Sequence, residues 1–211
     1  PRLQDINANY SLAASWRASS QAGGSSGADD PPLNIAPIVT NEILTHTDLP
    51  AVDAIELHNP TAAAVNVSGW FLTDDQGTPK KYRIPTDTAP IPAGGYLVVN
   101  ETQFNNPGSP TSFSLSSHGD NVFLFSAALD GALTRYSQGF SFRAAANGVS
   151  FGRYTNSVGE VLYPAQNSLT LGAVNSGPKV GPIVINEINY HPSASGDEFI
   201  ELKNITGSPV N

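Results

Sequence analysis

The sequence predicts an all-β protein, an antiparallel β-sandwich that occurs as a tandem repeat. Three observations lead to this prediction. Apolar and polar residues alternate over short runs between residues 38 and 153. Turn-forming residues separate most of these runs, and the chain contains 19 Gly and 17 Pro among its 211 residues. A stretch of 30 residues occurs twice, which is typical of repeat architectures.

The expected strands are short and follow one another closely. In order, they cover residues 38–44, 54–59, 65–67, 70–73, 80–84, 96–100, 112–115, 122–125, 133–136 and 149–153. Polar residues and Gly interrupt the runs at four expected hairpin turns, residues 75–77, 92–95, 118–121 and 130–131. No stretch shows a sustained helical period, so packed antiparallel sheets are the economical arrangement.

The repeat defines the expected organisation of the chain. Residues 37–66 align without a gap on residues 182–211, and 14 of the 30 positions are identical. Unrelated segments would share roughly two at a typical residue frequency of ~6 %. The same shift of 145 residues places Gly27-Ala28 on Gly172-Ala173. We therefore expect four regions: the C-terminal remnant and linker of a preceding unit (1–34), one complete sandwich (35–171), a linker (172–181) and the first strands of a truncated following unit (182–211).

Composition excludes several classes of function. The net charge is −8, and the ten basic residues form no run, so nucleic acid is not an expected partner. No apolar stretch approaches the ~20 residues that a membrane span needs, so we expect no membrane insertion. Cysteine is absent, which excludes disulfides, thiol nucleophiles and thiolate metal sites. The low content of charged residues, 13 %, suits an extracellular protein.

Comparison of the two repeats separates a core face from polar positions that do not vary. Ile55 and Leu57 are identical in both and are predicted to face the core, whereas their neighbours change. Glu42, Glu56 and His46 are also identical. A pair of carboxylates could catalyse glycoside hydrolysis, and His46 could join them as a metal ligand. The favoured interpretation is structural, with the glutamates accepting hydrogen bonds from N–H groups of loops.

Calcium is the one cofactor for which the sequence offers candidates. Asp53, Asp74 and Asp75 lie in expected loops, with Asp48 close by, and Ca²⁺ binds clustered carboxylates. The spacing fits no EF-hand, and Asp74-Asp75 also suits a hairpin turn. Trp70 is predicted to be a core residue. If it were exposed it would instead suggest a platform on which a sugar stacks.

The order of four motifs resembles the lamin-tail domain family over about residues 36–137. The motifs are residues 185–188 with 198–204 (and their first-repeat counterparts), 67–72, 92–99, and 118–125 with 129–131. The resemblance implies an immunoglobulin-like β-sandwich and a non-catalytic module for adhesion, scaffolding or targeting, often found beside enzymatic domains in bacterial proteins. Nuclear members of the family also contact DNA, but the acidic balance of this chain departs from that behaviour.

We therefore expect a non-catalytic structural repeat module of a large secreted or cell-surface bacterial protein. Its expected partners are copies of itself or neighbouring units, which would add strands at exposed sheet edges and could build filaments. One alternative is a targeting module that binds a polysaccharide or another ligand and is attached to an enzyme. A second is an enzyme with a pocket in which Glu42, Glu56 and His46 converge.

Overall fold

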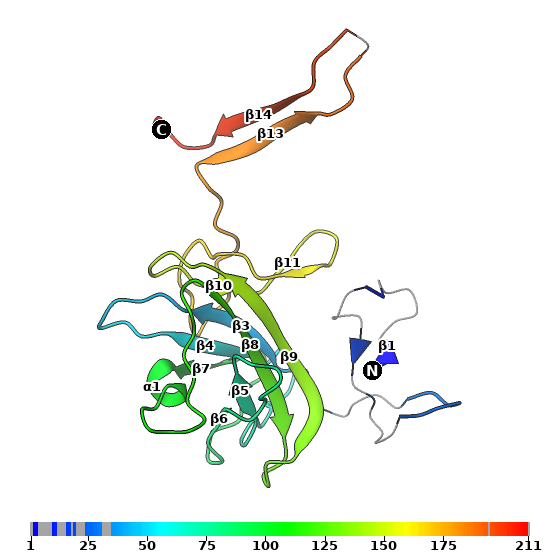
Figure 1. Cartoon of the computed structure of the whole chain (residues 1–211), viewed down its shortest axis with the longest axis vertical. Coiled ribbons are helices and arrows are strands. Elements are labelled where there is room, and N and C mark those ends of the chain that lie inside the picture. Colours follow the sequence, from blue (N-terminus) through cyan, green and yellow to red (C-terminus); the bar gives the residue numbers. More distant parts are fainter. Residues whose placement is uncertain are drawn as a thin grey trace.

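Two four-stranded antiparallel sheets face each other and form a β-sandwich (Figure 1). This computed structural model describes residues 2–3, 10–11, 16–17, 19, 24–30, 35–193 and 195–210. The first sheet has the order β10 (Phe151–Gly152), β3 (Val39–Leu44), β4 (Ala54–His58) and β7 (Tyr96–Asn100). The second has the order β6 (Tyr82–Arg83), β5 (Phe71–Thr73), β8 (Gly119–Ala127) and β9 (Leu133–Arg143). The predicted antiparallel β-sandwich is confirmed.

The core lies between the two sheets and contains the residues that the repeat predicted. Ile55 and Leu57 of β4 have no exposed surface, and they join one cluster with Leu124 of β8. Trp70 is 6 % exposed and belongs to the same cluster, so its predicted core position is confirmed. Burial of these apolar side chains is the main force that holds the sheets together.

Residues 112–115 form no strand, contrary to the prediction. Phe113 is nonetheless only 5 % exposed, and its ring stacks on Phe104 with the ring centroids 4.9 Å apart. Phe104 ends the single-turn helix α1 (Glu101–Phe104). The apolar residues that suggested a strand therefore anchor a loop and a helical turn to the core, which a local pattern of hydrophobicity does not distinguish from a strand.

The turn predicted at residues 118–121 lies two residues earlier: the Gly119 N–H donates to the Ser116 carbonyl at 3.2 Å, and β8 begins at Gly119, which pairs with Arg143. β9 is correspondingly longer than expected and continues to Arg143 rather than ending at Tyr136. Gly139 permits this long ladder, since a Cβ at that position would lie 2.2 Å from the carbonyl oxygen of Val122. A glycine and polar residues thus occur here within paired strands, where sequence reasoning assigns them to turns.

Side chains of β9 fasten the second sheet to β3 of the first. The Tyr136 hydroxyl donates to the Ile38 carbonyl at 2.7 Å. Gln138 accepts a hydrogen bond from the Thr40 backbone N–H through Oε1, also at 2.7 Å. Thr40 lies beside a β-bulge in β3, where the ladder with β4 shifts between Thr40 and Glu42. The bulge aims Asn41 and Glu42 toward the outer face of the first sheet.

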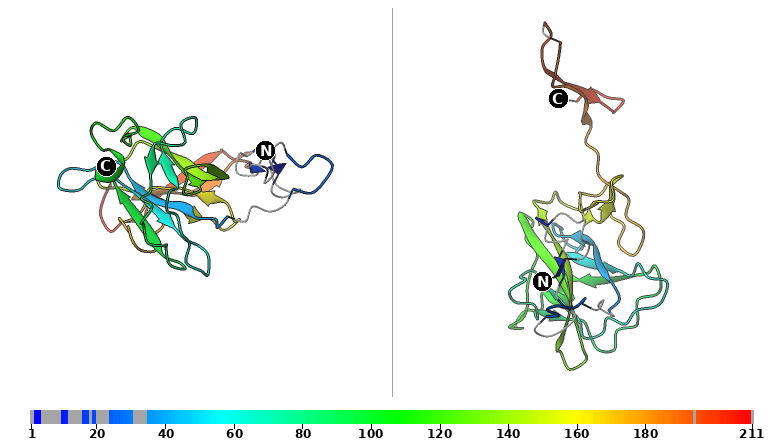
Figure 2. Two further views of the ribbon diagram at one scale, coloured as in Figure 1. Left: turned by 90° about the horizontal axis from the view of Figure 1, so that it is seen from below. Right: turned by 90° about the vertical axis from the view of Figure 1, so that its right-hand side faces the viewer.

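Three two-stranded ribbons lie outside the sandwich. They are β1 (Arg2–Leu3) with β2 (Trp16–Arg17), β11 (Tyr154–Thr155) with β12 (Val161–Leu162), and β13 (Ile183–Asn189) with β14 (Phe199–Asn204). The β13–β14 hairpin projects away from the sandwich at the end of an extended segment (Figures 1 and 2). Every residue of β14 is exposed.

The described part of the chain contains no helix whose length and apolar character would let it span a membrane.

Candidate functional site

Glu42 and Glu56 face each other across strands β3 and β4. The antiparallel register makes them Cα partners, and both side chains have no exposed surface. Ile55 and Leu57, the neighbours of Glu56 in β4, point into the core, so Glu56 lies on the opposite, outer face of the sheet. Two buried carboxylates side by side repel each other and lose their hydration, so they require nearby hydrogen-bond donors. We call these two residues the carboxylate pair.

The donors come from residues 150–178, a segment that begins with the edge strand β10 and continues beyond it, and that we call the trailer. Glu42 accepts three hydrogen bonds from it: from the Ser150 hydroxyl to Oε1 at 2.5 Å, from the Thr170 backbone N–H to Oε1 at 3.1 Å, and from the Thr170 hydroxyl to Oε2 at 2.7 Å. The Gly172 backbone N–H donates to Glu56 Oε2. The predicted structural role of the glutamates, as acceptors for N–H groups of a loop, is confirmed.

A tight turn presents these trailer groups to the carboxylates. The Ala173 N–H donates to the Thr170 carbonyl at 2.9 Å and closes the turn. Gly172 has φ of 85°, which a residue with a side chain rarely adopts. This backbone conformation lets the N–H groups of Thr170 and Gly172 bond to adjacent carboxylates.

The side-chain amides of Asn41 and Asn175 connect the remaining carboxylate oxygen, Glu56 Oε1, to the trailer. Asn41 Nδ2 donates both to Glu56 Oε1, at 2.7 Å, and to Asn175 Oδ1, at 2.8 Å. Asn175 Nδ2 donates in turn to the Arg153 carbonyl at 2.9 Å, and the Arg153 N–H donates to the Asn41 carbonyl at 2.7 Å. The network therefore joins β3, β4 and the trailer, and its bonds from Asn175 lie within the stretch expected to be a linker.

Gln166 buries a further part of the trailer against β10. Its side-chain amide is 2 % exposed and donates to the carbonyls of Gly152 and Pro164, each at 3.2 Å. It also accepts from the Gly177 N–H at 3.0 Å. A Cβ on Gly152 would lie 2.6 Å from Gln166 Cδ, so a glycine is needed at that position for Gln166 to enter.

The electrostatics of the carboxylate pair suit a structural role. Burial raises the pKa of Glu56, and the hydrogen bonds from Gly172 and Asn41 act in the opposite direction by stabilising the carboxylate. The negative charge of Glu42 adds to the increase in that pKa. With the trailer in place, neither carboxylate has a surface that a substrate could reach.

His46 does not complete a metal site with the carboxylate pair. Its Nδ1 lies 2.8 Å from the Ala145 carbonyl, and its own carbonyl accepts from the Gly148 N–H at 2.8 Å. These contacts join the β3–β4 loop to residues 145–148. Across the described residues, no three His, Cys, Asp or Glu side chains form a group that could hold a metal ion.

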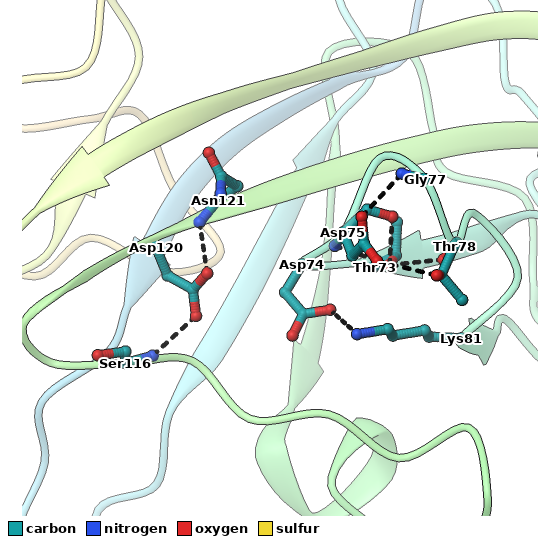
Figure 3. A network of polar contacts seen from close by, with 9 residues as sticks. All are labelled: Thr73, Asp74, Asp75, Gly77, Thr78, Lys81, Ser116, Asp120 and Asn121. Atoms are coloured by element: carbon teal, nitrogen blue, oxygen red, sulfur yellow. Dashed lines mark hydrogen bonds and ion pairs between the residues drawn. The ribbon is translucent and has the colours of Figure 1, made fainter.

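The structure separates the three calcium candidates into two places. Asp53 is 8 % exposed at the start of β4 and accepts from the Thr47 hydroxyl at 3.0 Å. Asp74 and Asp75 lie in the turn after β5 (Figure 3), where Asp74 pairs with Lys81 at 2.5 Å. Asp75 accepts from Gly77 and Thr78, each at 2.8 Å, as a residue of the predicted hairpin turn.

The pKa values of the calcium candidates reflect these protein contacts. Burial raises the pKa of Asp53. The hydrogen bonds from Thr78 and Gly77 lower the pKa of Asp75. Calcium binding at Asp53, Asp74 and Asp75 stays a prediction, which calorimetry tests: saturable heats on adding Ca²⁺ would support it, and flat heats would reject it.

Sequence reasoning identified the acceptors of this site but missed its donors. Ser150, Thr170 and Asn175 are more than 100 residues from Glu42 in sequence and carry no motif of their own. One signal was present. Gly172 and Ala173, the last two residues of the turn, align with Gly27 and Ala28 at the shift of 145 residues.

Residues 31–140, just over half of the chain, match a family model described as Lamin Tail Domain. No curated protein and no solved structure matches the chain. The match runs from before β3 into β9, so it contains both members of the carboxylate pair. The trailer and its donors lie beyond the matched residues.

Proposed function

The chain belongs to the lamin-tail domain family, and on this premise we propose that it is a non-catalytic structural module of a large secreted or cell-surface bacterial protein. The family is an immunoglobulin-like structural domain and not a known enzyme family. In this proposal the sandwich is one unit of a tandem array, and the units assemble or adhere through their bodies and their strand edges.

The proposal rests mainly on the hydrogen bonds that the carboxylate pair accepts from the trailer. A pair of carboxylates could suggest catalysis, but both glutamates are repeated in the sequence, which a structural role in every unit explains better. Their hydrogen-bond donors Ser150, Thr170 and Gly172 come from the trailer. The pair therefore fixes the segment through which the sandwich continues into the rest of the chain. A module in an array needs such a joint, because a flexible joint would not hold neighbouring units at a defined distance from each other.

The β13–β14 hairpin supports the tandem arrangement. We call β3–β4 the first hairpin and β13–β14 the second hairpin. Glu187 pairs with Glu201 in the second, as Glu42 pairs with Glu56 in the first, and each ladder shifts at the same place, just before the first glutamate. Equal register in two segments 145 residues apart is what a second unit would produce.

Strand edges offer the surface for assembly. β9 ends the second sheet, and among the described strands it pairs with β8 alone. Residues 137–142, between Arg135 and Arg143, contain no charged side chain. An uncharged edge presents unpaired N–H and C=O groups to which another strand can add.

The rival proposal, a polysaccharide-binding module, would need exposed aromatic rings on one face. Within residues 35–171, Tyr154 is the one aromatic residue among the exposed large apolar side chains, and a single ring forms no row on a face. The observations on the sandwich thus favour assembly over a sugar-stacking platform.

A charge placed on the β9 edge tests the proposal. Ser137 is an exposed residue of β9, and Ser137→Lys should shift the chain toward monomer because a charged edge resists strand addition. Thr111→Lys places the same charge in an exposed loop and should leave assembly unchanged. Sedimentation velocity of the full chain over a range of concentrations measures the difference. Wild-type protein that stays monomeric throughout, together with saturable binding to a polysaccharide, would favour the rival.

A further inference from the structure

The carboxylate pair is buried without a positive charge to compensate it. Among the described residues, no Lys, Arg or His side chain forms an ion pair with Glu42 or Glu56. The part of the trailer that covers the pair, residues 170–175, contains no ionisable side chain. Two adjacent carboxylates in such surroundings take up a proton more readily than a single exposed one, because the proton removes their repulsion and the cost of burying one charge.

Glu56 has no acceptor to which it could donate such a proton. Its Oε1 accepts from Asn41 Nδ2 at 2.7 Å, and its Oε2 accepts from the Gly172 backbone N–H. The orientation of the Asn41 amide is fixed, because the same Nδ2 also donates to Asn175 Oδ1 at 2.8 Å. Since N–H groups donate and do not accept, a proton on either oxygen of Glu56 would face another hydrogen.

Glu42 has one oxygen that faces a suitable acceptor. Its Oε2 lies 2.7 Å from Thr170 Oγ1, and a hydroxyl can either donate or accept. If Oε2 carries the proton, Thr170 Oγ1 accepts it and turns its own hydrogen away. Thr170 is half-buried, so water can accept that hydrogen. The Ser150 hydroxyl contacts Oε1 at 2.5 Å, but Ser150 is only 1 % exposed and has no such access to water.

We propose that the attachment of the trailer to the sandwich strengthens as the pH falls, because the carboxylate pair takes up one proton at Glu42 Oε2 and donates it to Thr170 Oγ1. Every hydrogen bond of the pair is kept in this exchange, since only the direction of the bond between Oε2 and Oγ1 reverses. The joint is thus a pH-sensitive device. It does not depend on how the modules assemble.

The electrostatics of the neighbouring groups give the same sign. Burial, with a contribution from the charge of Glu42, raises the pKa of Glu56 above its ordinary value of 4.5. Because the two carboxylates are coupled, the proton belongs to the pair and occupies the oxygen that can donate it. Stability from a raised pKa is fully present below the unfolded value and is lost as the pH rises through the folded value. Burial and the charge of Glu56 raise the pKa of Tyr96 in β7 above 10, so this phenol stays neutral throughout.

Replacing each glutamate with glutamine tests the proposal, because Gln ends in one acceptor and one donor. Glu42→Gln reproduces the protonated state, since its oxygen accepts the two hydrogen bonds of Oε1 and its Nε2 donates to Thr170 Oγ1. Glu56→Gln instead turns an NH₂ group toward an N–H donor, that of Gly172 or of Asn41. We expect Glu42→Gln to hold the trailer at least as tightly as wild type at pH 8, and Glu56→Gln to hold it less tightly at every pH.

Amide hydrogen exchange followed by NMR measures how tightly the trailer is held. The readout is the protection of the Gly172 N–H relative to that of Leu57, after correction for the intrinsic effect of pH on exchange. Leu57 lies in β4, which pairs with a strand on each side, so the ratio separates opening of the trailer from global unfolding. From pH 8 to pH 5.5 the ratio should rise in wild type, by at most about tenfold per pH unit because one proton is linked. In Glu42→Gln it should stay constant.

A charge control and a direct titration make the result specific. Glu160 is an exposed carboxylate of the trailer, so Glu160→Gln removes the same charge away from the pair and should keep the wild-type rise. In wild type, the carboxyl-carbon NMR signal of Glu42 should move over this pH range by more than that of Glu56.

Four results would overturn the proposal. They are a ratio in wild type that does not change with pH, a rise that persists in Glu42→Gln, a trailer that Glu42→Gln loosens at pH 8, and a carboxyl-carbon titration larger at Glu56 than at Glu42. None of them bears on assembly, which the Ser137→Lys test decides.

Discussion

The first and second hairpins have nearly the same backbone pairing and very different surroundings. In both, a glutamate pair follows a one-residue bulge, and an Asn side chain bonds to the second glutamate. Leu57 of the first hairpin has no exposed surface, whereas the equivalent Leu202 of the second is 65 % exposed. Local sequence therefore determines the hairpin, and burial is supplied by the rest of the sandwich and the trailer.

The comparison shows that one sequence motif can have different requirements in two surroundings. A buried carboxylate without donors is costly, so the first pair depends on the trailer for its stability. An exposed carboxylate keeps its water, so Glu187 and Glu201 of the second hairpin need no such donors. The predictions below substitute equivalent positions in the two hairpins, or two other residues that align at the shift of 145 residues, and compare the effects.

The largest difference is expected from the core leucines. Leu57→Ala should lower the free energy of unfolding by about 2–5 kcal/mol, because it removes buried methyl groups and leaves a cavity. Leu202→Ala should change it by less than about 0.5 kcal/mol, since an exposed residue makes few contacts. Urea denaturation followed by the fluorescence of Trp70 in the core measures both. Equal losses would mean that the second hairpin also belongs to a cooperative core.

The next largest difference in stability is expected between the asparagines at the end of each hairpin. Asn59 has no exposed surface and donates to the carbonyls of Ala63, Ile91 and Pro92. Asn59→Ala removes all three of these hydrogen bonds, and at about 1 kcal/mol each we expect a loss of about 2–3 kcal/mol. Asn204→Ala affects an exposed loop and should have little effect on the same urea transition. If the two variants behaved alike, the three carbonyl contacts would not be what stabilises this end of the sandwich.

The sequence predicted one half of the candidate site well. The period-2 pattern and the repeat identified Ile55 and Leu57 as core residues and singled out Glu42 and Glu56 as acceptors for a loop. The identity of the loop did not follow, because the pairing of Thr170 with Glu42 depends on how the chain returns to the sheet after 128 residues. Periodicity describes neighbours along a strand, and such distant contacts are specified only by the folded whole.

The same limit explains the errors in the fold. Residues 112–115 have the apolar content of a strand, yet Phe113 is buried through a ring contact with Phe104 and needs no ladder. Gly119 closes a turn with the Ser116 carbonyl and also begins β8, where its φ of 114° brings it close to the Phe142 carbonyl, so the strand starts earlier than the composition suggests. In both cases tertiary packing overrides the local preference.

The third comparison is between Thr170, which donates a hydrogen bond to the carboxylate pair, and Ser25, the residue that aligns with it. Thr170→Val removes the hydroxyl that bonds Glu42 Oε2 at 2.7 Å and should cost about 1–2 kcal/mol of stability, because a buried charged oxygen loses its donor. Ser25 aligns with Thr170 at the shift of 145 residues and begins a similar turn, in which the Ala28 N–H donates to its carbonyl at 3.0 Å. Because Ser25 is half-exposed, Ser25→Ala should cost less than about 0.5 kcal/mol. Thr170→Ser keeps the hydroxyl and is the control. Stability unchanged by Thr170→Val would show that the remaining contacts of the trailer hold it without this hydroxyl.

The smallest effect is expected at Asp53 and depends on pH. Burial raises the pKa of Asp53 above its ordinary value of 3.8, so the folded chain binds this proton more tightly than the unfolded chain. The contribution of a raised pKa is fully present below the unfolded value and is lost as pH rises through the folded value. Asp53→Asn can still accept from the Thr47 hydroxyl without carrying a charge. It should therefore melt at a higher temperature than wild type at pH 7, by an amount that shrinks toward pH 3.

The matched position in the second hairpin sharpens this test. Glu198 is the residue equivalent to Asp53 and is exposed, so water solvates its carboxylate in the folded and the unfolded chain alike. Glu198→Gln should leave the melting temperature unchanged at both pH values. A gain for Asp53→Asn that is the same at pH 3 and pH 7 would mean that burial of the charge is not its cause. The difference between the two positions would then lie in packing rather than in ionisation, since the two substitutions are otherwise alike.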